Sequence, residues 1–291
     1  MKINSGLIIL DKPKGISSFK AISILRKTLN LKKMGHGGTL DPDVTGVLPI
    51  FLAKSTRLIE YFDSFPKMYK VEAILGIKTD TLDNSGKIIK TSDKIPTILE
   101  FENTINSFIG DIYQTPPMHS AIHYNGRRLY ELAREGLTVE RKQRKQTIFW
   151  IKNFFYKYPL FSFEVSCSRG TYIRTLIDDI GENLNCFASM TKLIRLNTCN
   201  MPLENSYSIE DIEKLVDKKD YSFITDPTQY LTNINKLELD FKFKDDIICG
   251  REIPLKNINN GLYKLFIDNI FFGIAKVNNN NLKIEKMLYS E

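Results

Sequence analysis

The chain has 291 residues, of which 42% are hydrophobic and 26% are charged, as in a soluble globular protein with one large domain or two. Its 41 Lys and Arg outnumber its 34 Asp and Glu, and the net charge of +7 favours a polyanionic partner, although an AT-rich genome would also enrich Lys and Asn. No apolar run approaches the roughly 20 residues of a membrane helix, residues 7–10 are too short for a signal peptide, and the four cysteines show no CxxC spacing. We therefore expect a cytoplasmic protein with reduced thiols and no membrane segment.

The N-terminal segment predicts a strand followed by a helix. Residues 6–10 form a short apolar run, which is typical of a buried strand. Ser17 or Ser18 then caps a helix that continues to about Asn30 and carries apolar residues along one side.

The loop that follows this helix is too rich in glycine and proline for regular structure. Residues 35–49 hold four glycines and two prolines. Pro42 fixes the turn after Asp41 and biases Asp41 itself towards an extended conformation. The loop therefore presents one carboxylate, Asp41, and one imidazole, His36, as a candidate active site. The alternative is a structural turn in which Asp41 bonds its own backbone.

The middle of the chain contains an unusual basic segment. The elements predicted before it are strands over 47–52, 68–75 and 87–90, a helix that begins at Ser55, and a helix opened by the capping box of Thr97 and Glu100. Residues 115–146 then mix Arg and Lys with aromatic residues on an irregular segment, which suits RNA phosphates and exposed bases, although a solvated surface would show the same pattern. His119 and His123 are four residues apart with no third ligand nearby, so we expect no metal site.

A β-hairpin and a helix follow the basic segment. Residues 147–156 and 160–168 predict an antiparallel pair, and a helix is expected over about 171–184. Arg174 lies in the first turn of this helix, off its buried stripe, where a cation opposes the helix dipole. An anion held by Arg174 and the free backbone N–H groups would relieve this conflict. The alternative is a surface ion pair between Arg174 and Asp178.

The C-terminal part predicts a small second domain. Ser208 caps a helix to about Val216, and a polar stretch over 218–235 is expected to be the end of the main domain and a linker. The strands expected beyond it are 262–267, 271–277 and 282–287. We therefore predict an α/β protein of the α+β type, with a mixed, largely antiparallel central sheet flanked by helices. Residues 1–234 would form the main domain, and residues 235–291 a small all-β domain.

Residues 35–50, GHGGTLDPDVTGVLPI, resemble the active-site motif of the TruB family, the tRNA pseudouridine-55 synthases. The resemblance covers nearly the whole chain, with further matches at residues 12–15 (KPKG), Tyr69, Arg174 and the C-terminal tail. One departure is Gly37, where the family more often has Thr or Ser. Another is Asp43-Val44, where bacterial members often have Leu-Ala.

The resemblance implies a pseudouridine synthase fold with a PUA-like, RNA-binding tail, and an enzyme that acts on the uridine at position 55 of the tRNA T-loop. It implies Asp41 as the nucleophile, Tyr69 as a ring that stacks on the extruded uracil, and Arg174 as the partner of Asp41. Substrate contacts are expected from His36, in the space left by the flipped base, and from Gly38, Thr39, Arg57, Leu193, Arg127 and Arg128.

The implied reaction needs neither a redox group nor a metal. It breaks the N-glycosidic bond, turns the uracil and joins its C5 to C1′, without net hydrolysis, so we expect no cofactor. A carboxylate such as Asp41 can act covalently, either on C6 of the uracil or at the sugar. The family resemblance further implies the tRNA T-arm as the partner, no obligatory protein partner, and a monomer.

Other functions are compatible with parts of the sequence. A non-catalytic tRNA-binding or tRNA-folding protein on the same scaffold would not need Asp41, which is present. A guide-RNA-dependent family member would share the TLDP motif, but such members commonly carry a larger tail than this one. A sugar hydrolase would need a second acid as proton donor, and Asp43 is too close in sequence to Asp41 for that role.

Overall fold

A central sheet of nine strands organises the main part of the computed structural model, which describes residues 3–118, 120 and 122–289. The strand order is β1-β3-β12-β4-β11-β10-β7, with β2 beside β3 and β13 beside β12. The strands are β1 (Ser5–Lys12), β2 (Met34–His36), β3 (Thr45–Ala53), β4 (Lys67–Leu75), β7 (Gly110–Gln114), β10 (Arg144–Lys157), β11 (Leu160–Cys167), β12 (Ala188–Thr198) and β13 (Met201–Pro202). The β3–β12 pair is parallel and the other pairs of this sheet are antiparallel, so the predicted mixed, largely antiparallel sheet is confirmed.

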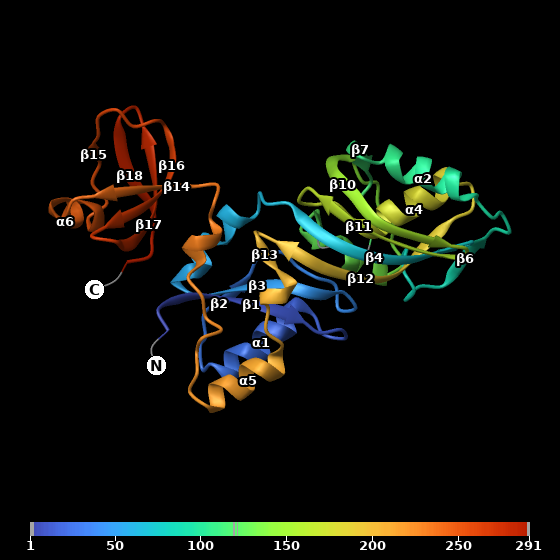
Figure 1. Cartoon of the computed structure of the whole chain (residues 1–291), viewed down its shortest axis with the longest axis horizontal. Helices are drawn as coiled ribbons and strands as arrows, with labels where there is room; N and C mark the ends of the chain where they lie inside the picture. Colours follow the sequence, from blue (N-terminus) through green and yellow to red (C-terminus); the bar gives the residue numbers. More distant parts are fainter. Residues whose placement is uncertain (1–2, 119, 121, 290–291) are drawn as a thin grey trace.

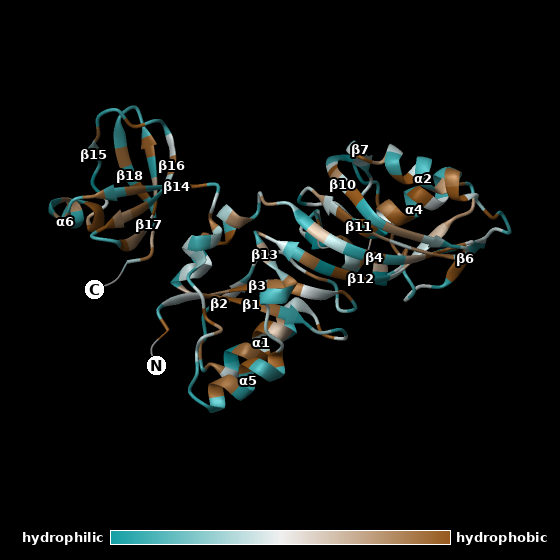
Figure 2. Ribbon diagram, in the orientation of Figure 1, coloured by the Kyte–Doolittle hydropathy of each residue, from teal (hydrophilic) through white to brown (hydrophobic). Residues whose placement is uncertain are grey.

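Helices cover the two ends of this sheet. Figure 1 shows α1 (Ser18–Thr28) and α5 (Ile209–Asp217) together beside β1 and β3, whereas α2 (Ile98–Ser107) and α4 (Ile173–Asn183) lie at the opposite end. Helices α1 and α5 each combine hydrophobic and hydrophilic residues along their length (Figure 2), as expected of helices that bury one side. Among the described residues, no helix is long and apolar enough to cross a membrane.

Local sequence signals place these helices as predicted. The side chains of Ser17 and Ser208 accept hydrogen bonds from backbone N–H groups in the first turns of α1 and α5. Thr97 and Glu100 form the expected capping box of α2. The helix expected from Ser55 is instead a 3₁₀ helix, η1 (Lys54–Phe62), which packs against β3.

The strand β1 separates two hydrophobic cores. Successive side chains of a strand point to opposite faces. Ile8 and Leu10 therefore pack into the larger core, together with α1. Leu7 and Ile9 pack into a second core, together with η1. The stretch over 218–235, which was expected to be the end of the main domain and a linker, packs in part along the edge of β1. There Thr225 exchanges two backbone hydrogen bonds with Leu7.

The predicted basic segment contains short elements of its own. The hairpin β8 (His123–Tyr124) and β9 (Arg127–Arg128) leads into α3 (Leu129–Arg134). A second small hairpin, β5 (Ile77–Thr79) and β6 (Ile88–Thr91), contacts α4, where Lys78 pairs with Asp178 and Glu182.

A separate β-sheet forms the C-terminal part (Figure 1). Its elements are β14 (Asn235–Leu239), α6 (Lys244–Ile248), β15 (Ile253–Pro254), β16 (Gly261–Ile267), β17 (Ile270–Asn278) and β18 (Asn281–Met287). The three strands predicted from the sequence correspond to β16, β17 and β18. The sheet has its own hydrophobic core and contacts η1, where Arg57 Nη1 donates to the carbonyl of Met287 at 2.7 Å.

Candidate active site

An exposed carboxylate meets a buried guanidinium at the loop between β2 and β3. The side chain of Asp41 is 54% exposed and that of Arg174 is 9% exposed, and Arg174 Nη2 donates to Asp41 Oδ2 at 3.0 Å. Arg174 was predicted to lie off the buried stripe of its helix, but the residue is buried, because the segment around Thr81 covers it. Arg174 Nη1 donates to the Thr81 carbonyl at 3.2 Å.

The alternative pairing of Arg174 with Asp178 is wrong. Asp178 pairs instead with Lys78, whose Nζ lies 2.8 Å from its carboxylate. Lys78 also contacts Glu182 one turn further along α4, at 2.7 Å. A neighbouring strand therefore supplies the cation that neutralises this side of α4.

A second carboxylate, Asp83, lies on the other side of Arg174. Its Oδ2 is 3.7 Å from Arg174 Nη1, and its Oδ1 accepts hydrogen bonds from the Thr81 hydroxyl at 2.7 Å and the Ser85 N–H at 3.0 Å. Asp83 is thus fixed by its own loop. Arg174 bridges this fixed carboxylate and the exposed Asp41, which orients the guanidinium towards Asp41.

Hydrogen bonds from two buried side chains, Lys12 and Ser18, hold the Asp41 loop in place. Lys12 Nζ donates to the carbonyls of Pro13, Ile16 and Pro42 at 2.8, 2.7 and 3.1 Å. The Ser18 hydroxyl donates to the Leu40 carbonyl and accepts from the Leu40 N–H, at 3.0 and 2.9 Å. Burial lowers the pKa of Lys12 to about 8, and the nearby acids Asp43 and Asp41 oppose this shift. Lys12 of the KPKG turn and Ser18 of α1 therefore anchor the two residues that flank Asp41.

Tyr69 is buried beside Arg195, a residue to which the sequence assigned no role. The two residues are register partners on β4 and β12, and burial raises the pKa of Tyr69 while Arg195 opposes the shift. Arg195 is fully buried; its Nε donates to the Val47 carbonyl at 2.7 Å and its Nη2 to the Gly38 carbonyl at 3.0 Å. It joins the Asp41 loop to the centre of the sheet. A charged residue within the apolar run of β12 was the signal that could have identified it.

The glycine at position 38 permits a close approach of cations. Gly38 has a φ of +87°, and a Cβ there would lie 3.2 Å from Lys67 Nζ and 3.5 Å from Arg195 Nη1. Burial and the Arg195 charge lower the pKa of Lys67. Leu193, two residues before Arg195 on β12, is buried in the larger core together with Tyr69.

The remaining predicted contact residues differ in their surroundings. His36 ends β2, and burial followed by the charge of Arg195 lowers its pKa. Thr39 is exposed on the Asp41 loop. Arg57, Arg127 and Arg128 lie elsewhere: Arg57 contacts the C-terminal sheet, and the other two lie on the exposed β8–β9 hairpin, where Arg127 pairs with Glu135.

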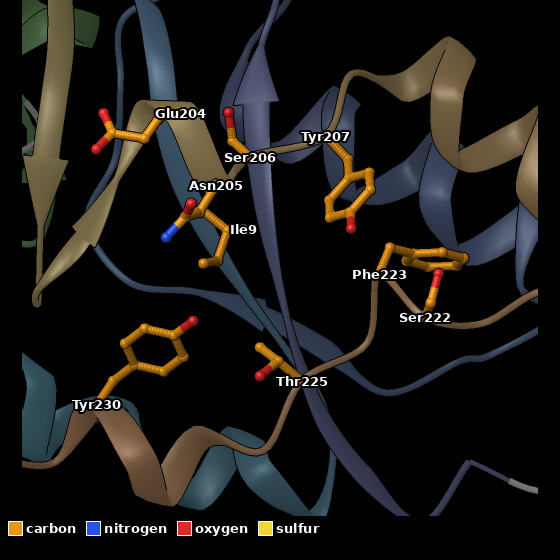
Figure 3. Close-up of a pocket in the computed structure, with 9 residues that line it drawn as sticks. All are labelled: Ile9, Glu204, Asn205, Ser206, Tyr207, Ser222, Phe223, Thr225 and Tyr230. Atoms are coloured by element: carbon orange, nitrogen blue, oxygen red, sulfur yellow. The ribbon is translucent and has the colours of Figure 1, made fainter.

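Two cavities lie outside this cluster. One, of about 440 Å³, lies beside β1 and is lined by residues such as Ile9, Tyr207 and Tyr230 (Figure 3). The other, of about 430 Å³, lies between the basic segment and α4, with Thr81 and Arg141 in its wall. Of the predicted site residues, none lines either cavity, and Thr81 connects the second cavity to Arg174.

The described residues contain no group of three or more His, Cys, Asp or Glu placed to hold a metal ion. His119, one of the two histidines considered for a metal, lies outside the described residues. The chemistry that the cluster offers is that of one accessible carboxylate set among buried cations.

Comparison with known proteins assigns the family. Residues 26–173 match the TruB family pseudouridylate synthase N-terminal domain, and residues 174–234 match the tRNA pseudouridylate synthase B C-terminal domain. The tRNA pseudouridine synthase B of Clostridium tetani is 39% identical over 291 residues, covering 98% of this chain and 99% of the relative. That of Streptococcus agalactiae is 40% identical over 296 residues, with the same coverage.

Solved structures share the fold at lower sequence identity. A chain of a Cbf5-Nop10-Gar1 complex superposes with a TM-score of 0.74 and 23% identity, over 98% of this chain and 85% of the other. A chain of an H/ACA RNP bound to a substrate RNA gives a TM-score of 0.75 and 22% identity, over 99% and 86%. The family models and the relatives near 40% identity show that this chain belongs to the TruB family of pseudouridylate synthases.

Proposed function

We propose that this chain isomerises uridine to pseudouridine in tRNA, at position 55 of the T-loop, with Asp41 as the catalytic carboxylate. The observation that carries this proposal is the 3.0 Å pair of exposed Asp41 and buried Arg174 on the loop that holds the family motif. The relatives at 39–40% identity are named tRNA pseudouridine synthase B, which supports the same substrate class.

The cluster provides the parts that the reaction needs. A flipped uridine would meet Asp41 on the accessible side of the loop, and Arg174 would orient the carboxylate for attack. Asp41 bonds to C6 of the uracil or to C1′ of the sugar, the bond between N1 and C1′ breaks, and C5 bonds to C1′. The bond to Asp41 then breaks, the proton on C5 is released, and N1 takes up a proton, so that the product is an isomer of the substrate. Tyr69 is buried, and this burial raises its pKa, so we propose that its role is to contact the uracil with its ring.

The other predicted residues receive substrate-binding roles in this proposal. We propose that His36 occupies the space left by the flipped base, that Leu193 packs on the uracil, and that Gly38 and Thr39 line the entry. The exposed hairpin with Arg127 and Arg128 would contact the phosphates of the T-arm. Arg57 contacts the C-terminal sheet, so we propose that it affects RNA binding by positioning that sheet.

The proposal includes an organisation in two domains. Residues 1–234 would form the catalytic domain, with an RNA-binding insertion at 115–146, and residues 235–291 a PUA-like RNA-binding domain. We propose that the enzyme acts in the cytoplasm as a monomer, without a cofactor, a metal or an obligatory protein partner.

Two other functions are less well supported. A non-catalytic tRNA-binding protein would not require the Asp41–Arg174 pair. A guide-RNA-dependent synthase is suggested by the fold neighbours from H/ACA complexes, but their identity to this chain is 20–23%, below that of the tRNA pseudouridine synthase B relatives.

The proposal is tested with an unmodified tRNA transcript that carries tritium at uridine C5. We expect the wild type to release tritium from the T-loop uridine without guide RNA, and Asp41→Asn to release none while still binding the transcript. Asp43→Asn is the matched control, because Asp43 is an exposed carboxylate on the same loop. Wild-type binding without release would contradict the proposal, as would release by Asp41→Asn.

A further inference from the structure

The segment before the Asp41 loop carries a concentration of positive charge. Residues 12–40 contain seven basic residues and no Asp or Glu: Lys12, Lys14, Lys20, Arg26, Lys27, Lys32 and Lys33. The net charge of this segment, +7, equals that of the whole chain. Apart from the buried Lys12 and the half-buried Arg26, these residues are exposed. Exposed basic residues attract phosphate backbones, and this segment has no acid of its own to oppose them.

An exposed aromatic ring lies in the middle of this charge. Phe19, in the first turn of α1, is 66% exposed, although its neighbours in the helix, Ser18 and Ala21, are buried. The guanidinium of Arg26 lies 6.0 Å from the centre of the Phe19 ring, and Arg26 Nη2 donates to the Met34 carbonyl at 3.1 Å. The hydrogen bond to Met34 therefore fixes Arg26 against β2, and its guanidinium contacts one side of the Phe19 ring.

The start of α1, which carries Phe19, lies next to β2 and is joined to the Asp41 loop. Phe19 and Arg26 are seven residues, about two turns, apart, so they share the side of α1 that faces β2. Thr28 lies nine residues after Phe19, on the opposite side, where it contacts Glu213 of α5. The chain next to Phe19 is joined to the Asp41 loop, through Ser18 to Leu40 and through the Gly15 N–H to the Pro42 carbonyl at 2.9 Å.

We infer that the N-terminal end of α1 is a second RNA-contact surface of this enzyme, where an unpaired base of the substrate tRNA stacks on Phe19 and the lysines Lys14 and Lys20 bind adjacent phosphates. Single-stranded bases stack on aromatic side chains beside basic residues in this manner. The inference rests on the proposed function, because it makes this surface an extension of the site that holds the target uridine. It explains why a large apolar ring remains in solvent within the most basic part of the chain.

The stacking contact is tested with Phe19→Ala, and Phe155→Ala is the matched control. Phe155 is 51% exposed on β10, outside the acid-free segment. In an Asp41→Asn background, which prevents turnover, we expect Phe19→Ala to weaken binding of the unmodified tRNA about 5- to 20-fold. Phe19→Tyr and Phe155→Ala should bind within about twofold of the parent. In the active background, Phe19→Ala should raise KM by a similar factor and leave kcat within about twofold.

The phosphate contacts are tested by their salt dependence. Replacing two phosphate-binding lysines, as in Lys14→Gln with Lys20→Gln, should reduce the slope of log Kd against log salt by about 1.5, whereas Phe19→Ala should leave the slope unchanged. Thermal unfolding of each variant verifies the fold.

The outcomes separate this inference from the proposed function. If the wild type binds tRNA but releases no tritium, the proposed function fails while the binding data still decide the inference. Unchanged tRNA affinity of Phe19→Ala, with normal tritium release by the wild type, overturns the inference alone. A loss of affinity in Phe155→Ala equal to that in Phe19→Ala also overturns it. Absence of tRNA binding by the wild type would overturn both.

Discussion

The Asp41 loop (residues 35–43) and the insertion (residues 115–146) are both irregular, but they are held in different ways. The Asp41 loop receives hydrogen bonds from four other elements, through Lys12 of β1, Ser18 of α1, Arg174 of α4 and Arg195 of β12. The ion pair that joins Arg127 of the insertion to Glu135 lies within the insertion, and residues 123–128 are exposed. The difference fits the two tasks that we propose for these segments, because bond breaking needs fixed geometry whereas binding a large RNA tolerates adjustment.

The strongest test of this contrast removes the guanidinium bridge. Arg174→Lys keeps the charge but cannot contact Asp41 and Asp83 together, since an ammonium lacks the fork of a guanidinium. We expect kcat for tritium release to fall about 100-fold or more, while the Kd for tRNA changes less than about threefold. Arg169→Lys, at an exposed arginine near the start of the same helix, is the control. If the Kd for tRNA rises by as large a factor as kcat falls, the prediction is wrong and Arg174 acts in RNA binding.

The buried anchor of the loop should affect stability and its pH dependence. The folded-state pKa of Lys12, about 8, lies below its ordinary value of 10.5, so between these pH values the unfolded chain binds more protons than the folded chain. Lys12 therefore makes the free energy of unfolding rise with pH from about 8 to 10.5, by on the order of 3 kcal/mol.

Lys12→Met should remove this rise and destabilise the protein, because three carbonyls lose their donor. Urea unfolding between pH 7 and 10.5 measures both effects. Lys14→Met, at an exposed lysine of the same turn, is the control. Parallel stability curves for the wild type and Lys12→Met would show that Lys12 does not titrate in this range.

Asp83 should contribute less than Arg174, because it acts on Asp41 only through the guanidinium. Asp83→Asn keeps the shape of the side chain and removes its charge, so we expect kcat to fall about 10-fold with KM nearly unchanged. Asp93→Asn, at an exposed carboxylate outside the cluster, is the matched control. Full activity of Asp83→Asn would mean that the loop around Thr81 alone positions Arg174.

The sequence predicted the parts of this site that depend on local pattern. The glycine- and proline-rich loop identified Asp41, and the family motif connected it to Arg174 across 133 positions. The burial of Arg174 was missed, because helical periodicity describes packing on one side, and the Thr81–Asp83 turn covers α4 on another. Arg195 was missed for a related reason.

Within an apolar strand run, an arginine is expected at the surface, and only the fold shows that Arg195 is buried between β3 and the Asp41 loop. For the stretch over 218–235, expected to be the end of the main domain and a linker, the sequence did not show how closely the chain packs. Its polar composition hides the few apolar residues, such as Phe223 and Leu231, that pack it against the body.

The smallest effect is expected from substitutions in the insertion. Replacing both hairpin arginines, as in Arg127→Gln with Arg128→Gln, should raise KM for tRNA about 3- to 10-fold and reduce the slope of log Kd against log salt by about 1.5, with kcat within about twofold. These residues lie on an exposed hairpin away from the Asp41–Arg174 pair, so loss of their charge should act on binding alone. Glu135→Gln is the informative companion, because it frees Arg127 from its partner and should lower KM if Arg127 contacts phosphate. A fall in kcat for the double variant would show instead that the insertion shapes the reacting site, and the division between a fixed catalytic loop and an adjustable RNA contact would no longer hold.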